Sequence, residues 1–181
     1  ELSYQFADHM DRLPSTLSEF EKALTKVTLD DQSWVKKQRP LRAELSDSLK
    51  KLYSRTLLTL RQMQDPTGGI IAAPEFQFEF TACGGYGYCW GRDAGFISLA
   101  MDVCGMHENS KEFYRYIARC QSADGSFLHR HDMAANLGAS WGLLQPDETG
   151  SVIFGLWQHL VLSKDTSLGI ELKEMVIKAA N

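Results

Sequence analysis

The residues that decide the fold form a stretch with almost no polar side, Asp93-Ala94-Gly95-Phe96-Ile97-Ser98-Leu99-Ala100-Met101-Asp102-Val103-Cys104. A helix that is apolar all round is buried on all sides. The stretch from Thr149 to Leu162 has the same character. The sequence therefore predicts two inner helices, each enclosed by other parts of the protein.

Three other stretches carry apolar residues on one side and charged residues on the other. They run from Ala43 to Met63, from Ser110 to Gln121 and from Ile170 to Ala180. This amphipathic pattern predicts helices with one face on the core and the other in water. Because outer and inner helices alternate along the chain, we expect an all-α fold with two concentric layers of helices.

Two long loops, Asp65 to Arg92 and Ser122 to Glu148, each lead from an outer helix into an inner one. Both loops should therefore reach the same end of the assembly, and the residues at their ends should lie close together. Within the first loop, polar residues alternate with Phe76, Phe78 and Phe80, which predicts a short extended segment.

Size, composition and charge limit the possible functions. The chain has 181 residues, 44% of them apolar, which is enough for one ordinary domain with a core. The net charge of -4 and the lack of a Lys/Arg stripe argue against nucleic acid and membrane partners. Four cysteines without zinc or disulfide-scaffold spacing predict reduced thiols.

The weakly periodic residues 1–42 are expected to form a linker with small helices that approaches a domain over residues 43–181. Glu1 to Asp11 contain no apolar run of signal-peptide length. The compartment stays unknown on this basis, with the cytoplasm slightly favoured.

The first candidate site segment runs from Gly84 to Asp93, where glycines separate three aromatic rings and an Arg-Asp pair follows. Sugars stack their C–H faces on Tyr and Trp rings, and their hydroxyls bond with a guanidinium and a carboxylate. The alternative is structural: Asp93 caps the helix and Arg92 neutralises it. This segment alone supports both interpretations equally, and it contains neither glycine pattern of nucleotide-binding loops.

The second candidate segment ends at Thr149 and offers Trp141, Gln145, Asp147 and Glu148 directly before an inner helix. The alternative is again a plain helix start, in which acids cap the first turn and favour the helix dipole. Two such segments at one predicted end favour a binding site.

Neither a metal site nor an acyl-hydrolase site is favoured by the sequence. His129 and His131 alternate in a way that could present two metal ligands, but no third ligand is near and Arg130 opposes a cation. We expect these residues, with Asp132, to lie in an exposed loop at the rim of a pocket. The Gly-x-Ser-x-Gly nucleophile elbow is absent.

Several motifs occur in an order that resembles glycoside hydrolase family 15, the bacterial glucoamylases and glucodextranases. They are Asp65 to Pro74, the Y-x-W-x-R-D of Tyr88 to Asp93, Asp124-Gly125-Ser126, and the W-G-x-L-Q-x-D-E-T of Trp141 to Thr149. The resemblance covers about Leu45 to Leu162. It differs at Gly91, where the family often has Pro or Thr.

The resemblance implies a partial (α/α)6 barrel and an inverting, exo-acting α-glucosidase that needs no cofactor and releases glucose from α-linked glucans or oligosaccharides. Carried over, Arg92 and Asp93 hold the terminal glucose. The implied substrate-binding residues are Tyr88, Trp90, Arg92, Asp93, Trp141, Gln145 and Glu148.

Inverting hydrolysis needs an acid and a base about 6.5–9.5 Å apart. Adjacent residues such as Asp147 and Glu148 diverge on a helix, so they are not assigned these roles. In the family the acid lies in a later W-E-E segment and the base later still. We therefore expect a fragment of the catalytic domain that is inactive alone, exposes its inner-helix faces and needs the remainder of its own chain. The alternative is a small helical module that binds carbohydrate or protein without catalysis.

Overall fold

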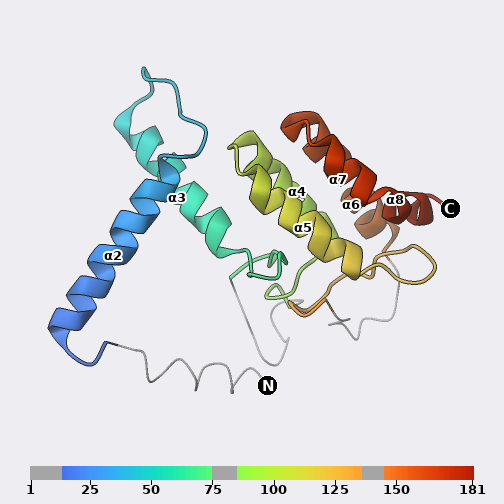
Figure 1. The fold of residues 1–181 in the computed structure, drawn as a ribbon, viewed down its shortest axis with the longest axis horizontal. Coiled ribbons are helices and arrows are strands. Elements are labelled where there is room, and N and C mark those ends of the chain that lie inside the picture. The colour runs from blue at the N-terminus through green and yellow to red at the C-terminus, as the bar shows by residue number, and fades with distance from the viewer. Residues whose placement is uncertain (1–13, 75–84, 136–144) are drawn as a thin grey trace. The chain divides into compact units, whose positions relative to one another are not determined.

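The structure, a computed structural model, describes residues 14–74, 85–135 and 145–181. Two compact units divide the chain, Glu1–Pro40 and Leu41–Asn181. The regular elements in the described ranges are all helices, which confirms the predicted all-α class (Figure 1). They are α2 (Leu17–Val35), α3 (Asp47–Gln62), α4 (Gly91–Val103), α5 (His107–Arg119), α6 (Pro146–Ser163), α7 (Thr166–Glu171) and α8 (Lys173–Ala179).

The first unit contains α2, a continuous helix of 19 residues. Thr16 and Glu19 form a capping box, in which each side chain accepts a hydrogen bond from the other residue's backbone N–H. The sequence from the start of α2 to residue 39 contains neither glycine nor proline. The expectation of small helices here was wrong, because a strong cap and the absence of glycine and proline allow one long helix.

The centre of the second unit is formed by α4 and α6, which run parallel to each other (Figure 1). In their first turns, the backbone N–H of Arg92 donates a hydrogen bond to Glu148. Near their last turns, Asp102 bonds with His159. Contacts at both ends require the same chain direction, so the two helices begin at the same end, as the arrangement of the loops predicted.

The helix between them in sequence, α5, packs on both α4 and α6. Its buried side carries Phe113, Tyr114 and Ile117, whereas Glu112 and Arg119 are exposed. This helix therefore has the amphipathic character expected of an outer helix. It covers one side of the α4–α6 pair.

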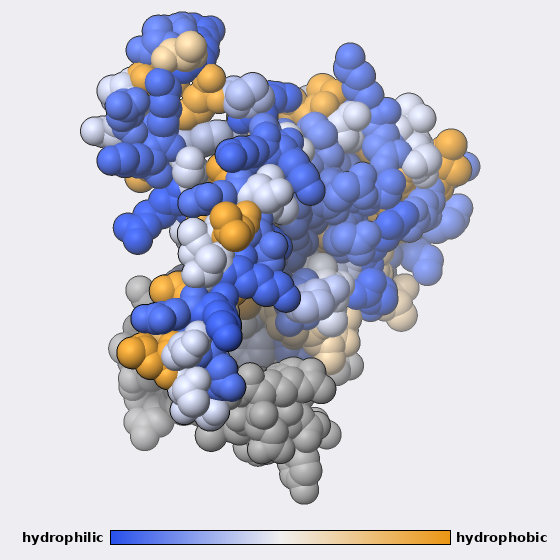
Figure 2. Space-filling model, turned by 60° about the vertical axis from the view of Figure 1, so that its left-hand side comes forward, coloured by the Kyte–Doolittle hydropathy of each residue, from blue (hydrophilic) through white to orange (hydrophobic). Residues whose placement is uncertain are grey.

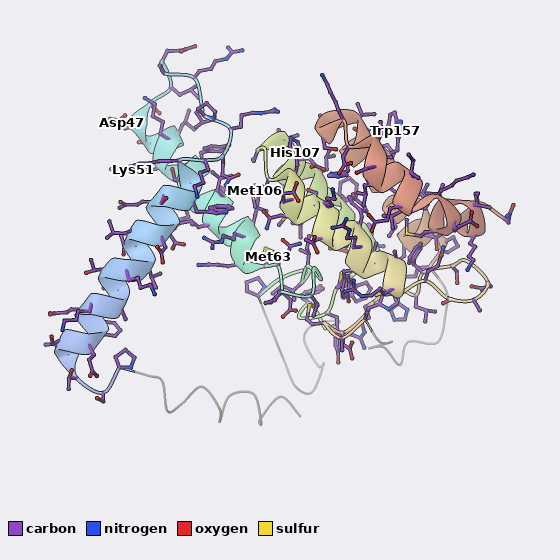
Figure 3. All side chains as sticks on the ribbon, in the orientation of Figure 1. Asp47, Lys51, Met63, Met106, His107 and Trp157 are labelled. Carbon is purple, nitrogen blue, oxygen red and sulfur yellow. The ribbon has the colours of Figure 1, made fainter. Side chains whose placement is uncertain are left out.

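The opposite side of the α4–α6 pair is open to solvent. Phe96 on α4 is exposed, as are Phe154, Val161 and Trp157 on α6, the last with 56% of its surface accessible (Figure 3). The sequence analysis expected these helices to be enclosed in a complete domain and to expose their faces in a fragment. The exposure of these faces in this chain is confirmed. On the face of the molecule seen in Figure 2, hydrophobic residues form separate patches within a mostly hydrophilic surface.

The bounds of the expected helices differ from those of the structure: α4 begins at Gly91, α5 at His107 and α6 at Pro146, each two or three residues earlier than expected. The helix expected from Ala43 begins at Asp47, because Ser46 caps it through the N–H of Leu49. The helix expected over residues 170–180 is two short helices with a break at Leu172. The extended segment expected around Phe78 lies outside the described residues.

None of the helices in the described ranges combines the length and the apolar character that a membrane span needs. The described cysteines are free: Cys89 and Cys120 are buried, and Cys104 is partly exposed. The expectation of reduced thiols agrees with these three positions.

Close packing of α5 on α6 depends on Gly155. A Cβ added at this position would lie 2.6 Å from the Tyr114 hydroxyl and 3.5 Å from the Cα of Gly95. Tyr114 is fully buried. The three central helices therefore meet at this level, where a side chain on residue 155 has no room.

We expect Gly155→Ala to destabilise the chain by about 1–3 kcal/mol, because the new methyl group overlaps the Tyr114 hydroxyl. Gly150→Ala in the same helix is the matched control. A Cβ added there meets no described atom within 4 Å, and alanine favours a helix by roughly 0.5–1 kcal/mol over glycine. Urea unfolding checks both variants, and equal changes in stability would contradict the packing described.

Candidate functional site

Arg92 joins the ends of the two long loops. Its backbone N–H donates a hydrogen bond of 2.6 Å to Glu148 Oε2, and its Nη1 lies 3.2 Å from Glu148 Oε1. The same Nη1 donates to Gln145 Oε1 at 3.5 Å and to the carboxylate of Asp147. The convergence of the two loop ends, expected from the order of the helices, is therefore present in the structure.

Three acids surround the Arg92 guanidinium. Besides Asp147 and Glu148, Asp93 places Oδ2 at 3.6 Å from Nη2. Partial burial opposes the charge, but the hydrogen bond to Asp147 and the charges of Glu148 and Asp93 raise the pKa of Arg92 above its ordinary value. The Asp93 and Asp147 carboxylates are partly exposed. The site thus has a partly exposed guanidinium, held in place by ion pairs, beside partly exposed carboxylate acceptors.

Glu148 differs from the other two acids because its side chain is 0% exposed. Burial raises the pKa of this carboxyl to about 7, although the N–H and the charge of Arg92 act in the opposite direction. Glu148 Oε1 has no hydrogen-bond partner among the described residues. The carboxyl group therefore interacts with the backbone N–H and the guanidinium of Arg92 and does not face solvent.

Gly91 makes this close approach possible. A Cβ at residue 91 would lie 3.2 Å from Glu148 Oε2 and 3.0 Å from a methyl group of Val152. The missing side chain at Gly91 therefore leaves room for the buried carboxyl group.

We expect Glu148 to make the chain less stable as the pH rises through about 7. Its pKa is higher in the folded state than the ordinary 4.5, so the folded state holds the proton more tightly. The higher pKa contributes about 3 kcal/mol to the free energy of unfolding. This contribution is fully present below about pH 4.5 and is lost by about pH 7.

Urea unfolding at several pH values, with and without Glu148→Gln, checks this expectation. The variant should lose this part of the pH dependence, because its amide does not titrate. Glu112→Gln, at an exposed position of α5, is the control and should leave the dependence unchanged. Identical pH profiles for the wild type and Glu148→Gln would rule the effect out.

The aromatic part of the first segment packs against the histidine cluster. Cys89 and His131 pair their backbones in an isolated bridge, with N···O distances of 2.9 and 2.8 Å. His129, Arg130 and His131 are all buried. The expected exposed position of these residues was wrong, because the bridge holds their segment against residues 85–90 and buries it.

Arg130 stacks on two rings of the same segment. Its guanidinium carbon lies 4.7 Å from the centre of the Tyr88 ring and 5.9 Å from that of Trp90. Trp90 is buried, contacts the ring of His129 and donates its indole N–H to the carbonyl of Gly85. Trp90 therefore supports the loop, while Tyr88 is partly exposed.

The structure thus brings together four of the seven predicted site residues, Arg92, Asp93, Gln145 and Glu148. Tyr88 and Trp90 belong to the loop that leads directly into this group, and Trp141 lies outside the described residues. A role in sugar binding stays a prediction for all seven.

Sequence reasoning missed a second polar cluster, formed by Asp102, His107 and His159. Its members are far apart in sequence, and each occurs in a stretch whose pattern concerns packing. The signals available were Asp102 and His159, two polar residues in helices expected to be buried.

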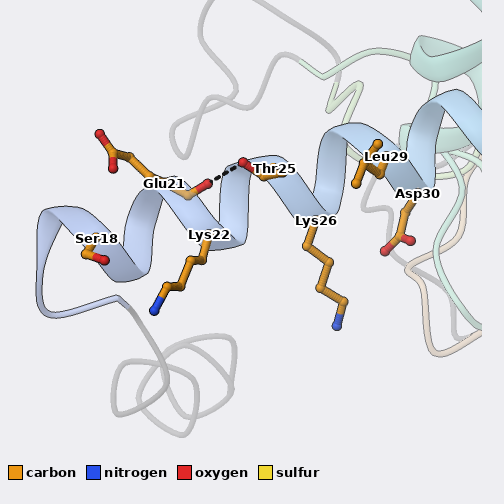
Figure 4. Close-up of a pocket in the computed structure, with 7 residues that line it drawn as sticks. All are labelled: Ser18, Glu21, Lys22, Thr25, Lys26, Leu29 and Asp30. Atoms are coloured by element: carbon orange, nitrogen blue, oxygen red, sulfur yellow. Dashed lines mark hydrogen bonds between the residues drawn. The ribbon is translucent and has the colours of Figure 1, made fainter.

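A depression on α2 involves this one helix alone. The residues that line it are Ser18, Glu21, Lys22, Thr25, Lys26, Leu29 and Asp30 (Figure 4). Thr25 donates its hydroxyl to the backbone carbonyl of Glu21, which is a local helix contact. A single helix face does not enclose a ligand, so this depression is not taken as a site.

Comparisons with known proteins agree with a glycosidase-like fold. No protein-family model matches the chain. A protein of Methanocaldococcus jannaschii described as an uncharacterized glycosyl hydrolase is 34% identical over 134 residues, 72% of this chain and 20% of that protein. The chain therefore spans about a fifth of the length of this relative.

Solved structures share the fold at lower sequence identity. A wild-type glycosidase superposes with a TM-score of 0.61 at 18% identity, covering 78% of this chain and 42% of that one. A glycosidase variant gives the same values, and another gives a TM-score of 0.59. The described helices thus correspond to part of a larger known fold.

Proposed function

We propose that this chain is part of a glycoside hydrolase and contributes one side of its sugar-binding pocket. The observation that carries the proposal is the meeting of Arg92 and Asp93 with residues 145–148 at the common end of α4 and α6. A guanidinium next to partly exposed carboxylates suits neighbouring sugar hydroxyls, which both donate and accept hydrogen bonds. The similarity to a glycosyl hydrolase over 134 residues supports the enzyme class.

Within this class, we propose a glucoamylase-type enzyme of glycoside hydrolase family 15 that inverts configuration and removes glucose from the ends of α-linked glucans or oligosaccharides. The ordered motifs of Asp65 to Pro74, Tyr88 to Asp93 and Trp141 to Thr149 support this choice. The fold proposed with it is part of an (α/α)6 barrel, in which α4 and α6 are successive inner helices and α5 is an outer one.

The proposed roles follow from exposure. The partly exposed side chains of Arg92 and Asp93 hold the hydroxyls of one glucose ring, with Gln145 beside them. Glu148, predicted to line the pocket, contributes to binding through Arg92, because it is buried and accepts the backbone N–H of that residue. Asp147 bonds with Arg92 as well. With both acids of residues 147–148 bound to Arg92, the proposed catalytic acid and base come from another part of the longer protein.

The 181-residue chain alone is expected to show no detectable hydrolysis, because the residues that the structure describes hold a binding cluster and no separate acid–base pair. The longer protein encoded by the gene should release glucose from at least one of maltose, isomaltose, trehalose and dextran. Proton NMR of the first product should show the inverted anomer, β-glucose.

Three outcomes would count against the proposal. Turnover by the short chain would mean that the acid and base lie within it, and initial release of α-glucose would exclude inversion. Sugar binding without hydrolysis by the longer protein would favour the alternative, a helical binding module.

A further inference from the structure

A second polar cluster lies near the ends of α4 and α6, about 15 Å along α4 from Arg92. Asp102 comes from α4, His107 is the first residue of α5 (Figure 3) and His159 comes from α6. His107 Nδ1 lies 2.8 Å from Asp102 Oδ1. His159 Nδ1 lies 2.9 Å from Oδ1 and 3.0 Å from Oδ2 of the same carboxylate.

The Asp102 carboxylate is completely buried, and His159 is 1% exposed. A charge at such a depth needs a compensating partner of opposite sign. Among the described residues, the ion-pair partners within 4.0 Å of Asp102 are the two histidines, with no lysine or arginine. The cluster therefore combines a buried carboxylate with two imidazole nitrogens.

We propose that Asp102, His107 and His159 bind a divalent transition-metal ion, of which Zn²⁺ fits the donor set best. Two imidazole nitrogens and one carboxylate oxygen are common zinc ligands, and a water completes the tetrahedral set. The three ligand atoms lie within 4.8 Å of one another. The ion also supplies the positive charge that the buried carboxylate requires.

The geometry needs only a small adjustment to accept the ion. Metal–ligand bonds of about 2.0–2.1 Å in a tetrahedron place the ligand atoms about 3.3 Å apart. The N···O distances of 2.8–3.0 Å must therefore widen by a few tenths of an ångström. His107 is 33% exposed, which gives the ion and its water a route from solvent.

The surroundings of His159 suit a metal ligand. Its Nε2 lies 3.5 Å from the hydroxyl of Ser163, which also accepts a hydrogen bond from the backbone N–H of Asp165. When Nε2–H donates to this hydroxyl, the lone pair of Nδ1 points to the Asp102 side. The ring of Tyr114, 5.5 Å away between centroids, packs beside His159 and restricts its position.

Bound in this way, the ion ties α4, α5 and α6 together at the end remote from Arg92. Its role is therefore structural, and its presence is independent of the proposed glycosidase activity. Without an ion, the same three residues form a hydrogen-bonded Asp–His cluster. The two states differ in metal content and in the response of stability to zinc.

The test uses the purified chain after dialysis against a chelator. Before dialysis, elemental analysis should find about one zinc per chain. After dialysis, Zn²⁺ at roughly 100 times its dissociation constant should raise Tm by about 5–10 °C, whereas Mg²⁺ should not. Co²⁺ should produce the intense visible absorption of a tetrahedral site.

His107→Ala should abolish the zinc-induced shift in Tm while keeping the helical circular dichroism, because this residue is at the partly exposed start of α5. His159→Gln is the second ligand variant, and Glu108→Ala, at the next and exposed position, is the control that should keep the full shift. The proposal is overturned if Zn²⁺ leaves Tm unchanged, or if the shift persists in both histidine variants.

Discussion

Arg92→Ala, made in the proposed longer glycosidase, is expected to lower kcat/KM for the proposed α-glucoside substrate at least about 100-fold. Among the described residues, this guanidinium is the only cation within ion-pair distance of Asp93, Asp147 and Glu148. Each charged hydrogen bond to a sugar hydroxyl contributes about 1.5–3 kcal/mol, and two such bonds correspond to a loss of this size. Asp93→Ala should cause a loss of the same order.

The design separates binding from folding. The N–H that bonds Glu148 belongs to the backbone of Arg92 and is retained in Arg92→Ala, so the start of α4 should keep its position. Arg92→Lys retains a charge without the two-pronged geometry and should lose about 10-fold. Arg55→Ala, at an exposed position of α3, is the matched control. Near-normal kcat/KM in both Arg92→Ala and Asp93→Ala would remove these residues from the pocket.

Hydrophobic patterns were sufficient to predict helices in the regions of α3, α4, α5 and α6, and the amphipathic character of α5. The amphipathic stretch that became α5 buries Phe113 and Ile117 and exposes Glu112, because a single stripe of apolar residues can face only one way. The patterns could not locate the break at Leu172, which has neither glycine nor proline to mark it. Such a break depends on how the last residues pack, which is a tertiary property.

The site was predictable to the extent that topology alone determines it. Two loops that enter parallel helices must meet, and Arg92 meets Glu148 across 56 positions. The pair Asp102 and His159 has nearly the same offset, 57 residues, because parallel helices in contact keep their register. The complete burial of Glu148 was not predictable, since it depends on which neighbouring side chains close over its carboxyl group.

Gly125→Ala is expected to destabilise the chain by about 3 kcal/mol or more, which lowers Tm by roughly 6–12 °C. Gly125 has a φ of +90°, a conformation that alanine rarely adopts. A Cβ there would also lie 2.0 Å from the carbonyl oxygen of Lys178 and 2.5 Å from its carbonyl carbon. Because these are backbone atoms of α8, the clash cannot be relieved by turning a side chain.

The structural disturbance caused by Gly125→Ala should extend from this turn to the candidate site. The residue after the turn's Ser126 is Phe127, whose N–H donates a 3.0 Å hydrogen bond to Thr149 in the first turns of α6. A displacement of the turn therefore shifts, through this hydrogen bond, the start of α6, the helix that carries Glu148. Truncation after Ile177 removes Lys178 and leaves only the cost of the φ angle, about 1–2 kcal/mol. Gly125→Ala should thus cost less in the truncated chain, and an equal cost in both chains would show that α8 does not press on Gly125.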